Sequence, residues 1–77
     1  MPYIAIKSWP GRDKEQQMKI GKAVIKAFAE TAEIPVEAFS LSYEDVPQDK
    51  WDQEVTQGDH VRLGDQVIIP AGPKDWK

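Results

Sequence analysis

The stretch PYIAIKSWPGRD, residues 2–13, contains a short strand, a chain break and the start of a helix in immediate succession. Residues 2–8 alternate in character, as the side chains of a strand with two distinct faces do. One face carries Ile4, Ile6 and Ser8, and the other carries Tyr3, Ala5 and Lys7. The Pro10-Gly11 pair then ends the strand. Asp13 has the character of a helix N-cap, with Gln16 three residues later in the pattern of a capping box.

Beyond this stretch, the sequence predicts a helix over residues 14–32 and a second strand over residues 39–44. Apolar residues recur through the helix at spacings of three and four, at Met18, Gly21, Val24, Ile25, Phe28 and Ala32. Pro35 ends the helical region. In the second strand one face carries Phe39, Leu41 and Tyr43, and the other carries Ser40, Ser42 and Glu44. Strand, helix and strand in about 45 residues form a β-α-β unit, for which we expect parallel strands.

The length of 77 residues predicts one small domain with a marginal core. Domains of this size often depend on disulfides, metals or oligomerisation for support. The sequence has no cysteine, and its single histidine, His60, argues against a protein metal site. Two parallel strands also leave sheet edges and a face uncovered. We therefore expect self-association, with a second subunit that extends the sheet and covers its open face.

The net charge is −3 with an isoelectric point near 5.0, and the ten basic residues do not form a block. A nucleic-acid-binding domain more often carries a basic stripe and an isoelectric point above about 9. No apolar run approaches the length of a membrane-spanning helix, and no signal-peptide pattern opens the sequence. We therefore expect a soluble, cytoplasmic protein without nucleic-acid or membrane partners.

Beyond Val46 the sequence is less informative. Residues 47–66 are mostly polar, with Trp51 and Val55 as the expected apolar anchors. The run Val67-Ile68-Ile69 is compatible with a short strand that pairs with a neighbouring subunit. Residues 70–77 read as a tail, in which Trp76 is either a docking side chain or simply exposed.

Pro2 is chemically notable because it directly follows Met1. Removal of Met1 would leave an N-terminal proline, whose nitrogen is a secondary amine that can act as a base or a nucleophile. Elsewhere in a chain, proline has neither an N–H group nor basicity. The structural alternative is a proline at the first position of a strand, where it is tolerated. If Met1 is retained, the nitrogen is a tertiary amide and the catalytic hypothesis fails.

Several segments together resemble the 4-oxalocrotonate tautomerase family: Pro2-Tyr3-Ile4, Pro10-Gly11-Arg12, Glu15-Gln16-Gln17, Pro35, the second strand, and Asp45-Val46 to Trp51. The similarity covers about residues 2–55, and the longer C-terminal part is more like the small dimeric members. The resemblance implies an α+β fold, in which a β-α-β subunit with parallel strands pairs with a second subunit into a four-stranded sheet covered by two helices. We expect one domain over residues 1–77, with a core of residues 2–55 and a C-terminal extension of residues 56–77.

The same resemblance implies cofactor-free keto–enol tautomerisation of small 2-oxo acids and their enol forms. The family's terminal proline, its general base, falls on Pro2. The arginine of its Gly-Arg pair falls on Arg12, where a guanidinium can bind a carboxylate and stabilise an enolate. The pocket aromatic falls on Trp51. A second arginine of the family falls on Ser40, which leaves Arg62 or a lysine to replace it.

Arg12 and Trp51 also have structural interpretations, as a surface arginine near a turn and as a core aromatic. The lone histidine, His60, is expected to be a surface or structural residue. The strand-end acids, Glu44 and Asp45, are expected to be solvated. Two other functions stay open. Pro2 would act as a general acid or a nucleophile in hydratase, dehalogenase or decarboxylase chemistry. Alternatively, the chain is a non-catalytic oligomeric binding protein of the same fold. We expect a homodimer rather than a hexamer, because the extra C-terminal residues would cover surfaces used for higher assembly.

Overall fold

The structure is a computed structural model that describes residues 1–72. The chain divides into two compact units, Met1–Pro47 and Gln48–Lys77. The expected partition into a core of residues 2–55 and an extension of residues 56–77 stays a prediction, and Trp76 lies outside the described residues. Within residues 1–72, no helix has both the length and the apolar character needed to cross a membrane.

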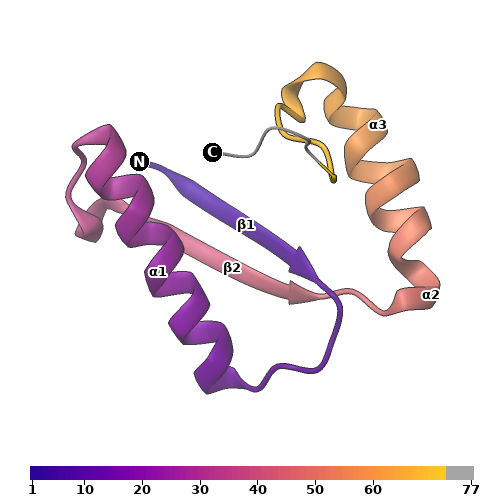
Figure 1. The fold of residues 1–77 in the computed structure, drawn as a ribbon, viewed down its shortest axis with the longest axis horizontal. Helices are drawn as coiled ribbons and strands as arrows, with labels where there is room; N and C mark the ends of the chain where they lie inside the picture. Colours follow the sequence, from indigo (N-terminus) through magenta and orange to yellow (C-terminus); the bar gives the residue numbers. More distant parts are fainter. Residues whose placement is uncertain (73–77) are drawn as a thin grey trace. The chain divides into compact units, whose positions relative to one another are not determined.

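The first unit is a β-α-β unit with two parallel strands (Figure 1). Strand β1, Tyr3–Ser8, is followed by helix α1, Lys14–Ala32, by a short 3-10 turn, Val36–Ala38, and by strand β2, Ser40–Asp45. The strands pair in register from Tyr3 opposite Ser40 to Ser8 opposite Asp45. The predicted β-α-β fold with parallel strands is therefore confirmed, and its pairing with a second subunit stays a prediction.

Helix α1 begins with the capping box that the sequence predicts. The Asp13 carboxylate accepts a hydrogen bond from the Gln16 N–H at 2.8 Å, and Gln16 Oε1 accepts one from the Asp13 N–H at 3.1 Å. At the other end, Glu33 adopts the left-handed conformation with φ 58°, and its N–H donates to the carbonyl of Ala29. This pattern satisfies a carbonyl of the last turn and redirects the chain, so local signals set both ends of α1.

One face of the sheet packs against α1, with a close approach at Gly21. A Cβ atom added to Gly21 would lie 3.1 Å from Leu41 Cδ2, so the glycine permits the close approach of helix and strand. Leu41 pairs with Ile4 in the register, which places the Ile4 side chain on the same face. Phe28 and Phe39 meet edge to face, with ring centroids 5.1 Å apart.

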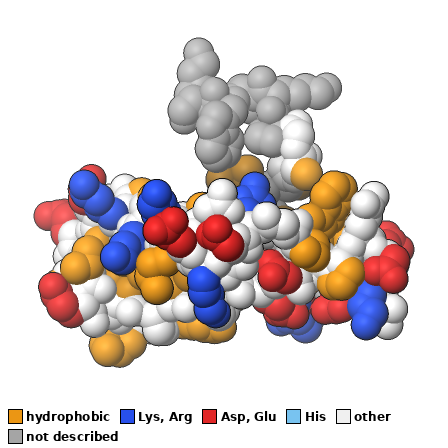
Figure 2. All heavy atoms as spheres, turned by 90° about the horizontal axis from the view of Figure 1, so that it is seen from below, with side chains coloured by type: hydrophobic (Ala, Val, Ile, Leu, Met, Phe, Trp, Pro, Cys, Tyr) orange, Lys and Arg blue, Asp and Glu red, His pale blue; other side chains and the backbone are white. Residues whose placement is uncertain are grey.

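The core of this unit is small, and much apolar surface stays exposed. Ala29 and Val46 are buried, whereas Met18 is 59% exposed and Phe28 is 45% exposed. Figure 2 shows hydrophobic side chains at the surface between acidic and basic ones. The sheet face opposite α1 is mostly polar, with Tyr3, Ala5, Lys7, Ser40, Ser42 and Glu44. A single copy thus has the marginal core that its size leads one to expect.

The second unit begins with one helical segment that changes its hydrogen-bond pattern twice. Helix α2, Gln48–Trp51, continues as the π-helical η2, Asp52–Asp59, and as α3, His60–Leu63, before a 3-10 turn at Gly64–Gln66. The sequence did not predict this helix, because the segment has few apolar residues and π-helical turns do not follow a 3.6-residue period.

Two expectations for the second unit have different outcomes. Val55 is 6% exposed, which confirms it as a buried anchor. Within the part of the chain that the structure describes, Val67, Ile68 and Ile69 form no strand. The pairing of this run with a neighbouring subunit stays a prediction.

Candidate functional site

Pro2 lies at the start of β1 and is fixed there through its backbone. Its carbonyl accepts a hydrogen bond from the Ser40 N–H at 3.1 Å, which joins the beginnings of the two strands. Pro2 is half-buried, whereas Met1 is fully exposed. Removal of Met1 would therefore disturb no packed side chain and would leave the proline nitrogen at the end of the sheet.

Hydroxyl groups surround the beginnings of the strands on the face opposite α1. Ser40 stands opposite Tyr3 in the register, and the Tyr3 hydroxyl lies 2.7 Å from Ser42 Oγ. Sequence reasoning named Ser40 but missed the pair of Tyr3 and Ser42. The alternation of the two strands contained the signal, because it places these residues on one face. Ser40 thus lies next to Pro2 in the structure.

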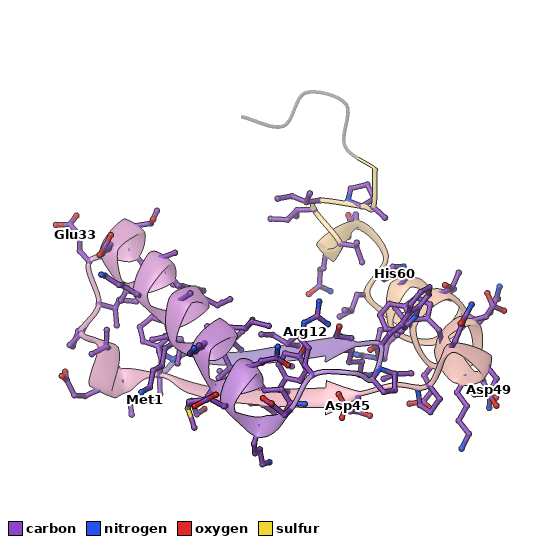
Figure 3. All side chains as sticks on the ribbon, turned by 60° about the horizontal axis from the view of Figure 1, so that its bottom comes forward. Met1, Arg12, Glu33, Asp45, Asp49 and His60 are labelled. Atoms are coloured by element: carbon purple, nitrogen blue, oxygen red, sulfur yellow. The ribbon has the colours of Figure 1, made fainter. Side chains whose placement is uncertain are left out.

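Arg12 lies at the opposite end of the sheet from Pro2. Its Nη1 atom donates to Ser8 Oγ at 3.4 Å, at the last residue of β1. Ser8 follows Pro2 by six residue positions, and at about 3.3 Å per strand residue these six steps span about 20 Å. Figure 3 shows this separation, with Met1 at one end of the strands and Arg12 and Asp45 toward the other. A single chain therefore does not bring Pro2 and Arg12 together.

The loop that carries Arg12 is held by a side chain from the first turns of α1. Gln17 Nε2 donates to the Arg12 carbonyl at 3.2 Å and to Asp45 Oδ1 at 3.3 Å. The Val46 N–H donates to the Ser8 carbonyl at 2.8 Å and extends the strand pairing beside them. Sequence reasoning treated Asp45 as solvated and gave Gln17 no role, because neither residue belongs to a recognisable catalytic pattern.

Trp51 and Arg62, the other two predicted site residues, belong to the second unit. Trp51 is half-buried at the end of α2. Arg62 Nη2 forms an ion pair with Asp59 Oδ1 at 3.0 Å, and the arginine side chain is 66% exposed. His60 is exposed, as expected for a surface residue. The first unit thus contains Pro2, Arg12 and Ser40.

The first unit also has a groove of about 300 Å³ between α1 and β2, lined by Lys14, Gln17, Met18, Gly21, Lys22, Ile25, Leu41 and Tyr43. None of the five predicted site residues lines this groove, so it is distinct from a site at Pro2. Among residues 1–72, no group of three or more His, Asp or Glu side chains is arranged to hold a metal ion.

Comparison with known proteins identifies the family of the chain. A family model described as tautomerase enzyme matches residues 2–60, beginning at Pro2. No curated protein and no solved structure matches the chain. The match confirms the resemblance at the level of the tautomerase enzymes and is compatible with the 4-oxalocrotonate group within them. The chain therefore belongs to the tautomerase family.

Proposed function

We propose that the chain is a cofactor-independent tautomerase that interconverts enol or dienol and keto forms of 2-oxo acids, with Pro2 as general base. The observation that carries this proposal is the family match, which begins at Pro2 at the head of β1. The proposal requires removal of Met1, whose side chain is fully exposed. The hydrogen bond from Ser40 would keep the new terminus beside β2.

The reaction needs only the movement of a proton within the substrate. The neutral Pro2 nitrogen would take a proton from one atom of the substrate and return one to another, acting first as a base and then as an acid. The Arg12 guanidinium would hold the carboxylate and stabilise the negative charge on the enolate oxygen. A cation close to the amine also disfavours its protonated form, which keeps the base available.

Because Arg12 lies about 20 Å from Pro2 in one chain, we propose that a second copy supplies the arginine. If two β1 strands pair antiparallel across a two-fold axis, the end of one strand lies beside the beginning of the other. Paired strands are about 4.8 Å apart, so Arg12 of the second chain would come next to Pro2. Pairing through β2 would instead leave three strand spacings, about 14 Å, between the two β1 strands.

A homodimer built through β1 would have the four-stranded sheet and two helices that the resemblance implies. The face opposite α1 supports pairing at the edge, because its only aliphatic residue is Ala5 and it offers little apolar area to a covering subunit. Hexamers remain compatible with this dimer as their building block. The composite arrangement makes the site dependent on assembly.

The remaining predicted residues have supporting roles in the proposal. Trp51 would form an apolar wall that excludes water from the reacting atoms. Ser40 would offer a hydroxyl to the substrate in place of the family's second guanidinium. Arg62 would have to leave its ion pair with Asp59 to bind a substrate carboxylate, so Arg62→Ala should alter turnover less than Arg12→Ala.

The test combines intact mass with turnover of enol-pyruvates and 2-hydroxy-2,4-dienoates. We expect a mass without Met1 and a loss of about 100-fold or more in turnover for Pro2→Ala, the range for general acid–base catalysis. Equal rates for wild type and Pro2→Ala, in assemblies of equal size, would instead support a non-catalytic binding protein.

The pH dependence of turnover separates the base from the acid. If Pro2 acts as the base, activity is lost below the pKa of its amine, because the protonated nitrogen cannot accept a proton. If Pro2 acts as a general acid in hydration or dehalogenation, activity is lost above that pKa. The side of the pKa on which turnover is lost therefore decides between base and acid chemistry.

A further inference from the structure

We propose that Gln17 is a positioning residue for the reaction, because it fixes the loop that presents Arg12. This inference rests on the proposed function, in which Arg12 binds the substrate. It starts from one amide group, Gln17 Nε2, which donates to the Arg12 carbonyl at 3.2 Å and to Asp45 Oδ1 at 3.3 Å. The amide thus links the arginine loop to the end of β2.

The loop between β1 and α1 lies at the surface. Residues 9–13 are exposed, and Gly11 has φ 133°, a conformation that other residues rarely adopt. The guanidinium of Arg12 makes a hydrogen bond to Ser8 at 3.4 Å, beyond the usual range for an N–H···O bond. The arginine is therefore located mainly through its backbone, and Gln17 supplies the side-chain hydrogen bond to that backbone.

The chemistry of the two acceptors fixes the orientation of the Gln17 amide. A backbone carbonyl and a carboxylate only accept hydrogen bonds, so the NH₂ group and not the oxygen must face both of them. The two hydrogens of the NH₂ group suffice for the two acceptors. The bond to Asp45, at 3.3 Å, is also slightly longer than the usual range, but the charge of the carboxylate strengthens it relative to a neutral pair of the same length.

Asp45 has a fixed position at the end of β2, because it belongs to the strand pairing. It stands opposite Ser8 in the register, and the Ser8 carbonyl accepts the Val46 N–H next to it. Gln17 therefore fixes the backbone of Arg12 relative to the end of β2.

The neighbouring glutamine offers a matched control. Gln16 lies in the same turn of α1 and is exposed, whereas Gln17 is half-buried; the Gln16 side chain bonds to Asp13 in the capping box and makes no described contact with Arg12. A general loss of helix stability should therefore follow from Gln16→Leu, whereas a change in substrate binding should follow only from Gln17 variants.

The experiment measures kcat and KM on an enol-pyruvate for the full chain and its variants. Gln17→Leu removes both bonds and is expected to raise KM about fivefold, the effect of one ordinary hydrogen bond. Gln17→Glu retains the shape of the side chain and suits the first turns of a helix. Its carboxylate, however, only accepts hydrogen bonds and cannot donate to the Arg12 carbonyl or to Asp45. The variant should raise KM at least as much, and the repulsion between the new carboxylate and Asp45 should also lower the thermal midpoint. Gln16→Leu should lower the midpoint and leave KM unchanged.

A double-mutant cycle shows whether Gln17 acts through Arg12. In an Arg12→Ala background, Gln17→Leu should cause no further loss in kcat/KM, because the group that it positions is absent. Full additivity would overturn the inference, and so would an unchanged KM in both Gln17 variants while Pro2→Ala abolishes turnover. If Pro2→Ala leaves turnover unchanged, the proposed function fails and this inference fails with it.

Discussion

The composite site predicts that two inactive variants restore each other. Pro2→Ala removes the base but retains Arg12, and Arg12→Ala removes the guanidinium but retains Pro2. Because these residues lie about 20 Å apart within a chain, each site would take Pro2 from one copy and Arg12 from another. A mixed assembly then contains intact sites even though neither variant has one alone.

The recovered activity follows from counting chains. When equal amounts of the two variants are unfolded together and refolded, half of the chains supply an intact Pro2 and half supply an intact Arg12. If the chains combine at random, about a quarter of the sites receive both, and this fraction is the same for a dimer and a hexamer. We therefore expect about a quarter of the wild-type turnover, measured on an enol-pyruvate at equal total protein.

The control is the same pair of variants refolded separately and combined just before the assay, which should stay inactive until chains exchange. Recovery near zero in the co-refolded sample, with native-sized assemblies present, would refute the reasoning. It would mean that Pro2 and Arg12 act in the same chain.

Changes at three further positions test the fold. Asp13→Ala removes the N-cap of α1 and should lower the free energy of unfolding by about 1 kcal/mol in urea denaturation. Gly58→Ala places a Cβ atom 2.9 Å from the Gln53 carbonyl oxygen, so the π-helical backbone has to shift. Its thermal midpoint should fall, and an unchanged midpoint would argue against the π-helix. Gly21→Ala should be nearly neutral, because a gain in helix propensity of about 1 kcal/mol is offset by the contact with Leu41, 3.1 Å from the new Cβ. Gly21→Val should destabilise by about 1–3 kcal/mol, and equal stability of the two variants would contradict the close approach of helix and strand.

The sequence predicted the first unit well because its signals are local. Asp13 and Gln16 are three residues apart, so residues within one helical turn specify the start of α1. The two strands follow an alternation of period two, which specifies both their faces and, with the helix between them, their parallel direction. Packing partners from elsewhere in the chain were not needed for either inference.

The second unit escaped prediction for a physical reason. Its helix changes from α to π geometry after Trp51, so no single period relates its side chains. Val55 was correctly expected to be buried, because an isolated apolar residue in a polar segment has few alternatives. The helix itself had no comparable signal in the sequence, because its π-helical form is defined by backbone hydrogen bonds and not by a pattern of side chains.

The site was predicted as a set of residues but not as an arrangement. The resemblance supplied Pro2 and Arg12 as a pair, although the strand predicted over residues 2–8 already separates them. The role of Gln17 depends on three elements that meet only in the folded chain: the arginine loop, α1 and the end of β2. Such a contact has no periodic signature in the sequence.

The length of β1 explains why this small fold would need a second copy to react. A terminal amine must stand at the beginning of the first strand, and the loop after that strand is where the Gly-Arg pair occurs. The strand itself therefore holds the base and the cation apart by about 20 Å. An antiparallel copy of the same strand reverses this order and brings each amine next to the other chain's guanidinium. In the proposed dimer, two-fold symmetry would then create two equal sites in one step. Catalysis in this dimer would thus depend on the edge of β1 that pairs with the second chain.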